Sequence, residues 1–422
     1  MSLFKLPLPF KTLMLCVIII ASVAGHLTKT VETHSSFYIH AAHQSKSYLT
    51  HLKVGRRNEN KLVNKQDSMG NNVQNSTDII SHPGLLSGRN LLHEDNQSQY
   101  SQQIDLAKGA WGRLLHLANG NWLAICTEFP SHTTSVLKIW RSNNDLQTWH
   151  PLAEVGIPGR KMDNGELFQL SNGNLLLTCR SLIDNISYEL PVYESSDMGA
   201  SWKYLSMIME NNAVINENNP SQGLWEPTFY QLSDSKIAVA YSTEMHSIAS
   251  PSYSQICAFK VSNNNGTSWG SEHVMVEEPG GGSLRPGMPV VRRMSNGEYM
   301  EVSEIVGINN AEVCYKISPD GIHWPSGLGT PIPHQHAGPF LIALHDGRLV
   351  VTSCSNEISY SDDFGKTWKI VQPPVWNLGF THSYPAVYQV SGDMLAVISS
   401  HDGISMRLVS IDAHTQSVQV IK

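Results

Sequence analysis

The fold of this chain is decided by a repeated stretch whose clearest copy reads Ser361-Asp-Asp363-Phe-Gly365-Lys-Thr-Trp368. Related copies begin at Ser142, Ser195, Ser262 and Ser318, although the first is degenerate and the last is one residue shorter. The tryptophans that end the five copies are Trp149, Trp202, Trp269, Trp324 and Trp368, so the period is 44 to 67 residues. A unit that recurs at such a spacing is typical of solenoids and propellers.

Each copy, called a box below, has the chemistry of a tight turn. Asp or Asn accepts hydrogen bonds from backbone N–H groups, Gly adopts positive φ without strain, and Ser or Thr hydroxyls bond locally. The tryptophan is expected to pack the turn onto a sheet. We therefore assign the boxes a structural role and not a catalytic one.

A second repeat, out of phase with the boxes, consists of an apolar strand, a tight turn and another apolar strand. Its six turns are Asn119-Gly120, Asn172-Gly173, Ser233-Asp234, Asn296-Gly297, Asp346-Gly347 and Gly392-Asp393. Asn-Gly and Asp-Gly between β-rich runs are strong hairpin signals. Six hairpins and five boxes predict an all-β fold, namely a six-bladed β-propeller with four-stranded antiparallel blades of about 53 residues.

The two ends of the propeller are expected to meet in the last blade. That blade has no box, and its final strand is expected within Met406 to Ile421. A strand at about residues 99 to 110 is expected to close the ring and cover a sheet edge.

The N-terminal part of the chain differs from the repeats in composition. Lys5 and Lys11 flank an apolar run from Leu13 to Ala24 that ends in small residues. This layout predicts a signal peptide over residues 1–25, because the run is too short for an ordinary membrane span. Residues 26–100 are polar and aperiodic, which predicts a flexible glycosylated stalk or pro-region, and the propeller is expected over 101–422. The alternative is an uncleaved anchor that holds a lumenal enzyme on a stalk.

A secreted, extracellular location follows from the signal peptide. The sequence also carries glycosylation sequons, at Asn75, Asn96, Asn185 and Asn265. Five cysteines lie outside the signal, namely Cys126, Cys179, Cys257, Cys314 and Cys354. Five is an odd number, so at least one thiol is expected to stay unpaired within the chain.

The net charge of the chain and the spacing of its Cys and His residues argue against two classes of partner, nucleic acids and metal ions. The net charge of −7 and pI near 6.2 argue against nucleic-acid binding, which normally needs a basic stripe. No CxxC pair or His/Cys zinc spacing occurs, so no metal site is expected. We also expect a monomer, and no membrane contact unless the N-terminal segment is an uncleaved anchor.

The predicted strand directions assign the boxes and the candidate site to opposite faces. The hairpin turns and boxes lie on the bottom face, whereas each blade's first strand begins, and its second strand ends, on the top face. Polar residues at the top-face positions are Arg113, Glu128, Asp163, Glu166, Arg180, Glu226, Glu244, Arg285, Glu304, His336, Asn356, His382, Tyr384, His401 and Asp402. Carboxylates, arginines and a tyrosine around one funnel suit the binding and cleavage of a sugar, so we expect a carbohydrate substrate. Two carboxylates are what a glycosidase needs.

Three segments resemble glycoside hydrolase family 93, and the boxes are similar to the Asp-boxes of the sialidase superfamily. The segments are Leu224-Trp225-Glu226-Pro227 with Ala240 to Glu244, Arg285-Pro-Gly287-Met288-Pro289 with Asn296 to Glu304, and Gly338-Pro339-Phe340. The resemblance spans about 103 to 422. It implies a retaining exo-α-1,5-L-arabinanase that needs no cofactor. It further implies that Glu226 and Glu304 are the catalytic pair, with Glu304 as nucleophile and Glu226 as acid/base.

The other site residues follow from the same resemblance and from the top-face positions. Tyr384 is expected beside the anomeric carbon. Residues expected to bind substrate are Arg113, Asp163, Arg180, Trp225, Glu244, Arg285, His336 and His382. Two features depart from the family: Ser303 stands where a tyrosine is expected, and Trp111-Gly-Arg113 has no clear match. These departures put the identity of the substrate in doubt more than hydrolysis.

Two other functions stay open from the sequence. An exo-α-sialidase would use Arg113, Arg180 and Arg285 as a triad on the substrate carboxylate, with Tyr384 as nucleophile. Against it, Arg113 is followed by Leu-Leu and no Arg-Ile-Pro segment exists. The third possibility is a non-catalytic propeller that binds carbohydrate or protein, since fold alone does not decide function.

Overall fold

The computed structural model describes residues 103–131, 133–212, 223–232, 236–355, 357–371, 375–376, 383–400, 403–412 and 420–421. The predicted signal peptide and stalk lie outside these residues and stay predictions. Within the described ranges, no helix is long and apolar enough to cross a membrane.

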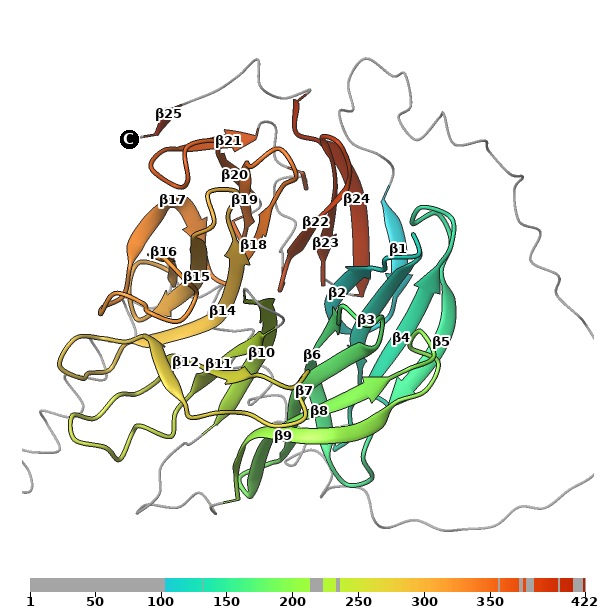
Figure 1. Cartoon of the computed structure of the whole chain (residues 1–422), viewed down its shortest axis with the longest axis horizontal. Coiled ribbons are helices and arrows are strands. Elements are labelled where there is room, and N and C mark those ends of the chain that lie inside the picture. Colours follow the sequence, from blue (N-terminus) through green and yellow to red (C-terminus); the bar gives the residue numbers. More distant parts are fainter. Residues whose placement is uncertain are drawn as a thin grey trace, which may run out of the picture. The chain divides into compact units, whose positions relative to one another are not determined.

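Six antiparallel sheets lie around a common centre (Figure 1). Blade 1 consists of β2 (Ala110–His116), β3 (Trp122–Glu128), β4 (Val136–Ser142) and β5 (His150–Val155). Blade 2 consists of β6 (Lys161–Gln169), β7 (Leu175–Ile183), β8 (Ser187–Ser195) and β9 (Lys203–Asn211). Blade 3 consists of β10 (Leu224–Gln231), β11 (Ile237–Thr243), β12 (Ile256–Ser262) and β13 (His273–Val276).

The second half of the ring repeats this plan. Blade 4 consists of β14 (Arg285–Arg293), β15 (Tyr299–Val306), β16 (Glu312–Ser318) and β17 (Thr330–His336). Blade 5 contains β18 (Phe340–Ala343), β19 (Leu349–Thr352), β20 (Ile358–Ser361) and β21 (Trp368–Val371). Blade 6 contains β22 (Ala386–Ser391), β23 (Met394–Ser399) and β24 (Ile404–Ser410). The predicted six-bladed all-β propeller is therefore confirmed.

The first strand of each blade is innermost and contacts the first strand of the next blade, from β2 around to β22 and back to β2. The predicted closing strand is β1 (Ile104–Ala107), which pairs with β24 as the outer strand of blade 6. The expected final strand differs: β24 ends at Ser410, and β25 (Val420–Ile421) pairs instead with β21 in blade 5. The outer edge of blade 6 is already covered by β1, whereas β21 offers a free edge to the C-terminal strand.

The boxes connect the third and fourth strands, as predicted. In blade 5, Asp363 Oδ1 accepts a hydrogen bond from Thr367 N at 2.9 Å, and Ser361 Oγ accepts one from Gly365 N at 2.8 Å. The degenerate first box keeps this geometry, with Asn144 in place of the aspartate and Leu146 at φ 71 in place of the glycine. The boxes thus act as turns on the face that carries the hairpin turns.

We expect Asp363→Ala to lower the free energy of unfolding by about 2 kcal/mol, because it removes charge-assisted bonds that hold the turn. Asp362→Ala is the matched control, since the exposed Asp362 carboxylate pairs with Lys369 Nζ at 2.6 Å and ion pairs at the surface contribute little. Denaturant unfolding of both variants measures the difference. Equal stability of the two variants would contradict this role of the box.

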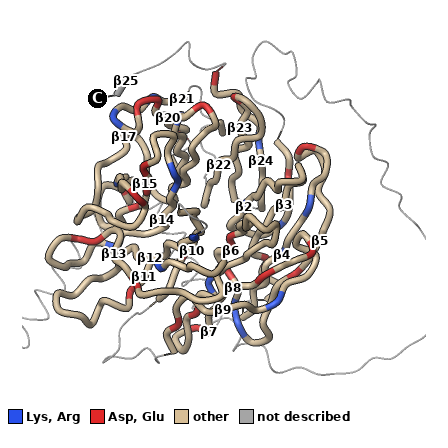
Figure 2. The backbone as a smooth tube through the Cα atoms, in the orientation of Figure 1, with Lys and Arg blue, Asp and Glu red and all other residues tan. Residues whose placement is uncertain are grey.

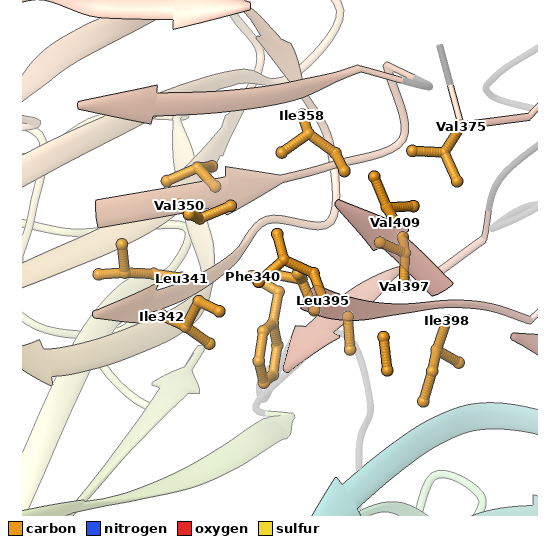
Figure 3. Close-up of a cluster of buried hydrophobic side chains, with 14 of the residues drawn as sticks. Phe340, Leu341, Ile342, Val350, Ile358, Val375, Leu395, Val397, Ile398 and Val409 are labelled. Carbon is orange, nitrogen blue, oxygen red and sulfur yellow. The ribbon is translucent and has the colours of Figure 1, made fainter. Parts of the chain in front are cut away.

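The core lies between neighbouring blades. Phe340, Leu341 and Ile342 of β18 pack in one buried cluster with Leu395 and Val397 of β23 (Figure 3). Both faces of a blade are covered, so second strands such as β11 are buried along their whole length. The prediction of unpaired cysteines is confirmed, because all five are free and four of them are buried. Acidic and basic residues are interspersed over the blades (Figure 2).

Candidate functional site

A backbone irregularity recurs near the start of the inner strand in every blade. Pairing shifts register after Ala110, Asp163, Trp225 and Gly287. The next residue has positive φ in each case, and blades 5 and 6 continue the series just before β18 and β22. The six positions are Trp111 (φ 58), Asn164 (φ 53), Glu226 (φ 53), Met288 (φ 53), Gly338 (φ 54) and Tyr384 (φ 49). We call these six the bulge residues.

The six bulge residues indicate that the candidate functional site lies at the top of the central channel. A bulge re-aims its side chain, and left-handed backbone at a non-glycine residue is strained and concentrates at functional sites. Sequence reasoning missed this series, although a signal for it exists. Each bulge residue precedes Gly or Pro, as in Trp111-Gly112, Asn164-Gly165, Glu226-Pro227, Met288-Pro289, Gly338-Pro339 and Tyr384-Pro385. Proline suits the position after the bulge because its nitrogen has no N–H that must pair with the next strand. Glycine suits it because a Cβ on Gly112 or Gly165 would lie 2.7 Å from an isoleucine carbon.

The two predicted catalytic glutamates are brought together at the bulge of blade 4. Glu226 Oε2 accepts hydrogen bonds from Met288 N at 3.0 Å and Ser242 Oγ at 3.2 Å. Glu304 is the cross-strand partner of Gly287, and a Cβ on Gly287 would lie 3.3 Å from Glu304 Oε1. Both carboxylates therefore border the Gly287–Met288 peptide.

The environments of the two carboxylates differ. Burial raises the pKa of Glu304 to about 7, the negative charge of Glu226 adds to the rise, and Gly338 N, 2.6 Å from Oε2, opposes it. Burial also raises the pKa of Glu226, but the Met288 N–H, Arg180, Ser242 and Arg285 all oppose that rise. More contacts therefore stabilise the charged form of Glu226 than that of Glu304, which favours Glu304 as the site of a shared proton. The roles expected from the sequence, Glu304 as nucleophile and Glu226 as acid/base, are opposite and stay a prediction.

A second group beside the pair consists of Asp163, Arg180 and Trp225. Arg180 Nη2 donates to Asp163 Oδ2 at 2.8 Å, and its guanidinium lies 4.3 Å from the centre of the Trp225 ring. Asp163 also accepts from Thr127 Oγ1 at 2.9 Å. The ion pair and the ring together form one wall of the site between blades 2 and 3.

A third group consists of Glu244 and Arg285. Arg285 Nη2 donates to Glu244 Oε1 at 2.5 Å and to Gln255 Oε1 at 2.6 Å. Glu244 is nearly inaccessible, whereas the Arg285 side chain is 37% exposed. Because Arg285 lowers the pKa of both Glu226 and Glu304, its guanidinium lies close to the two carboxylates.

Arg113 lies below the site and not at its surface. It is 2% exposed, it donates from Nη1 to Tyr384 O at 3.0 Å, and its guanidinium lies 4.3 Å from the Trp111 ring centre. Its partner is the buried Glu166, at 3.9 Å, whose pKa burial raises to about 7. The Trp111 and Tyr384 rings are 4.8 Å apart. This placement supports Tyr384 from below and exposes almost no part of Arg113 to a sugar.

Other predicted residues lie elsewhere. His336 was assigned to the fifth blade, but it ends β17 of blade 4, where it pairs with Glu312 and its backbone N donates to Ser353 Oγ. Burial of the imidazole lowers its pKa. His382, Asn356, His401 and Asp402 lie outside the described residues. Within the described ranges, no group of three His, Cys, Asp or Glu side chains is placed to hold a metal ion.

Comparison with known proteins gives a likeness of structure only. No protein-family model matches the chain, and no curated protein matches it. The α-L-arabinanase of Penicillium chrysogenum with arabinobiose matches with a TM-score of 0.63 and 21% identity, over 74% of this chain and 99% of that chain.

Two further structures extend this result. The family 93 α-L-arabinofuranosidase of Fusarium graminearum with arabinobiose matches with a TM-score of 0.61 and 18% identity, over 75% and 100% of the two chains. The NanB sialidase of Streptococcus pneumoniae matches with a TM-score of 0.53 and 9% identity, over 72% and 69%. The chain therefore has the six-bladed propeller fold that these glycosidases share.

Proposed function

We propose that the chain is a secreted, retaining exo-glycoside hydrolase that acts on arabinan-type oligosaccharides or polysaccharides. One observation carries the proposal: two half-buried carboxylates border one peptide, and more contacts stabilise the charged form of Glu226 than that of Glu304. An acid beside a carboxylate is what double displacement at a glycosidic carbon requires. The structural likeness to arabinanases supports the choice of sugar.

The reaction follows from this pair. Glu304 donates its proton to the glycosidic oxygen while Glu226 attacks the anomeric carbon, so the bond to the leaving sugar breaks and a glycosyl ester forms. Glu304, now a carboxylate, then takes a proton from water. The resulting hydroxide attacks the anomeric carbon of the glycosyl ester, which breaks the bond to Glu226 and releases the product with retained configuration.

The charges around the pair support a neutral sugar over a sialic acid. A sialidase needs arginines free to bind the substrate carboxylate. Here Arg113 is buried beside Glu166, Arg180 is paired with Asp163, and Arg285 is paired with Glu244. Burial, together with the negative charge of Asp163, also raises the pKa of Tyr384, which disfavours a tyrosinate nucleophile.

Secretion and glycosylation belong to the same proposal. Two of the four sequon asparagines, Asn185 and Asn265, are described, and both are exposed in loops, where a glycan can be attached. The signal-peptide pattern at the N-terminus supports export of the chain.

The proposal is tested with purified protein on linear α-1,5-arabino-oligosaccharides, a fluorogenic sialoside and a glycan-binding panel. We expect release of an arabinose disaccharide from the chain end. Cleavage of the sialoside alone would reject the proposal in favour of a sialidase. Binding of glycans without cleavage of any would indicate a binding propeller.

The dependence of kcat/KM on pH should show the titration of Glu226 and Glu304. Glu304 must be protonated and Glu226 ionised, so kcat/KM is expected to fall about tenfold per pH unit above pH 7 and to fall again on the acid side. The two carboxyls titrate as one system, so both limbs belong to the pair. Steady-state kinetics from pH 4 to 9 measures this, and a rate that keeps rising to pH 9 would contradict the assignment.

A further inference from the structure

Asn164 is a bulge residue that no sequence argument singled out. It occupies in blade 2 the position that Glu226 occupies in blade 3 and Tyr384 in blade 6, with φ 53 against 53 and 49. Its preceding residue, Asp163, pairs with Arg180 in the same way as Trp225 pairs with Ser242. Because a bulge at the same position re-aims its side chain in the same way, we expect Asn164 to face the site with Glu226 and Tyr384.

The side chain of Asn164 lacks a partner for one atom. The residue is 6% exposed, and its Oδ1 accepts no hydrogen bond from the described residues. A buried acceptor without a donor costs about 1–3 kcal/mol unless something else satisfies it. The backbone N of Asn164, in contrast, is held by Asp163 Oδ1 at 2.7 Å. The backbone is thus fixed, whereas the buried amide oxygen has no donor among the described residues.

A purely structural reason for asparagine is weaker. Asparagine tolerates positive φ better than most residues, which would explain its presence at a bulge. The same conformation is held here by Trp111, Glu226, Met288 and Tyr384, so the fold does not require asparagine. Its amide is therefore the feature that needs an explanation.

We propose that Asn164 binds substrate, with its amide oxygen accepting a hydrogen bond from a hydroxyl of the sugar unit held at Glu226 and Glu304. This inference rests on the proposed function. A neutral sugar supplies hydroxyl donors at this depth without adding charge next to Asp163. Asn164 would then set specificity, since a site built around a hydroxyl rejects sugars that lack it.

The test uses Asn164→Gly, because glycine accepts positive φ and removes only the amide. Asn265→Gly is the matched control: Asn265 has φ 57, but it lies in a box on the opposite face. Both variants are made in a host without N-glycosylation, so that the Asn265 sequon has no influence. The substrates are an aryl arabinobioside and analogues that each lack one hydroxyl of the unit next to the aryl group.

We expect Asn164→Gly to lower kcat/KM on the full substrate about 10- to 100-fold, and Asn265→Gly to leave it unchanged. For the analogue that lacks the contacted hydroxyl, wild type and Asn164→Gly should have equal kcat/KM. No loss on the full substrate, or the same loss with every analogue, would overturn the inference.

Failure of the proposed function gives a different result. If wild type cleaves no arabinoside, the same pair of variants is compared by calorimetric titration with arabinobiose. Weaker binding by Asn164→Gly alone would support the inference, and equal binding, or none by wild type, would overturn it.

Discussion

Glu226→Gln and Glu304→Gln are each expected to reduce kcat/KM on arabino-oligosaccharides by about 10²–10⁴-fold, with the fold of the protein unchanged. Glutamine keeps the shape of the side chain but can neither attack the anomeric carbon nor transfer the proton. Glu298→Gln is the control, since that glutamate lies at the hairpin turn of blade 4 and bonds to Asn296. Full activity in either site variant would remove that residue from the mechanism.

The roles of the two glutamates are separated by the leaving group and by azide. With Glu304→Ala, an aryl arabinobioside whose phenol leaves without protonation should still react, and azide should yield a product of retained configuration. With Glu226→Ala, azide can only attack the substrate directly and should yield the inverted product. Product configuration by NMR decides between the assignments, and the opposite pattern would restore the roles expected from the sequence.

Glu301→Gln is expected to raise the free energy of unfolding at pH 8 by an amount on the order of 1–3 kcal/mol. At pH 5 the same substitution should change the free energy of unfolding little. Glu301 is 0% exposed, and neither carboxylate oxygen has a hydrogen-bond partner among the described residues. Burial raises the pKa of Glu301, and Ser303 and Lys316 oppose the rise only in part. Glutamine avoids the cost of a buried charge.

The direction in which stability changes with pH follows from proton binding by Glu301. Between the unfolded and folded pKa values of Glu301, the native state holds a proton that the unfolded state has lost, so stability falls as pH rises through that range. Glu166 and Glu304, whose pKa values burial also raises, act in the same direction. Thermal unfolding of wild type, Glu301→Gln and Glu298→Gln at pH 5 and pH 8 measures the effect. A Glu301→Gln variant that is less stable at pH 8 would show that Glu301 and Lys316 form a stabilising pair.

Part of the site was predictable because it follows from strand direction. Antiparallel strands exclude the boxes from the top face, and this assigned Glu226, Glu304 and Tyr384 to one funnel. His336 was misplaced because the boundary between β17 and β18 depends on the register with Glu312, which no local pattern shows. Asn164 and the backbone contact of Met288 were missed because the bulge at these positions is a feature of the backbone. In the sequence it is marked only by the single Gly or Pro that follows each bulge residue.

The sequence by itself determined the architecture. Box and hairpin chemistry is local: Asp363 bonds to residues within a few positions of itself, so each turn can be found from its own residues, and counting the turns counts the blades. Only the tertiary structure decided where each top-face residue lies and what it contacts. Arg113 is a buried support, and Arg285 is a half-exposed neighbour of Glu226 and Glu304. Such differences arise from burial and from charges on other blades, which are far apart in the chain and meet only when the ring closes.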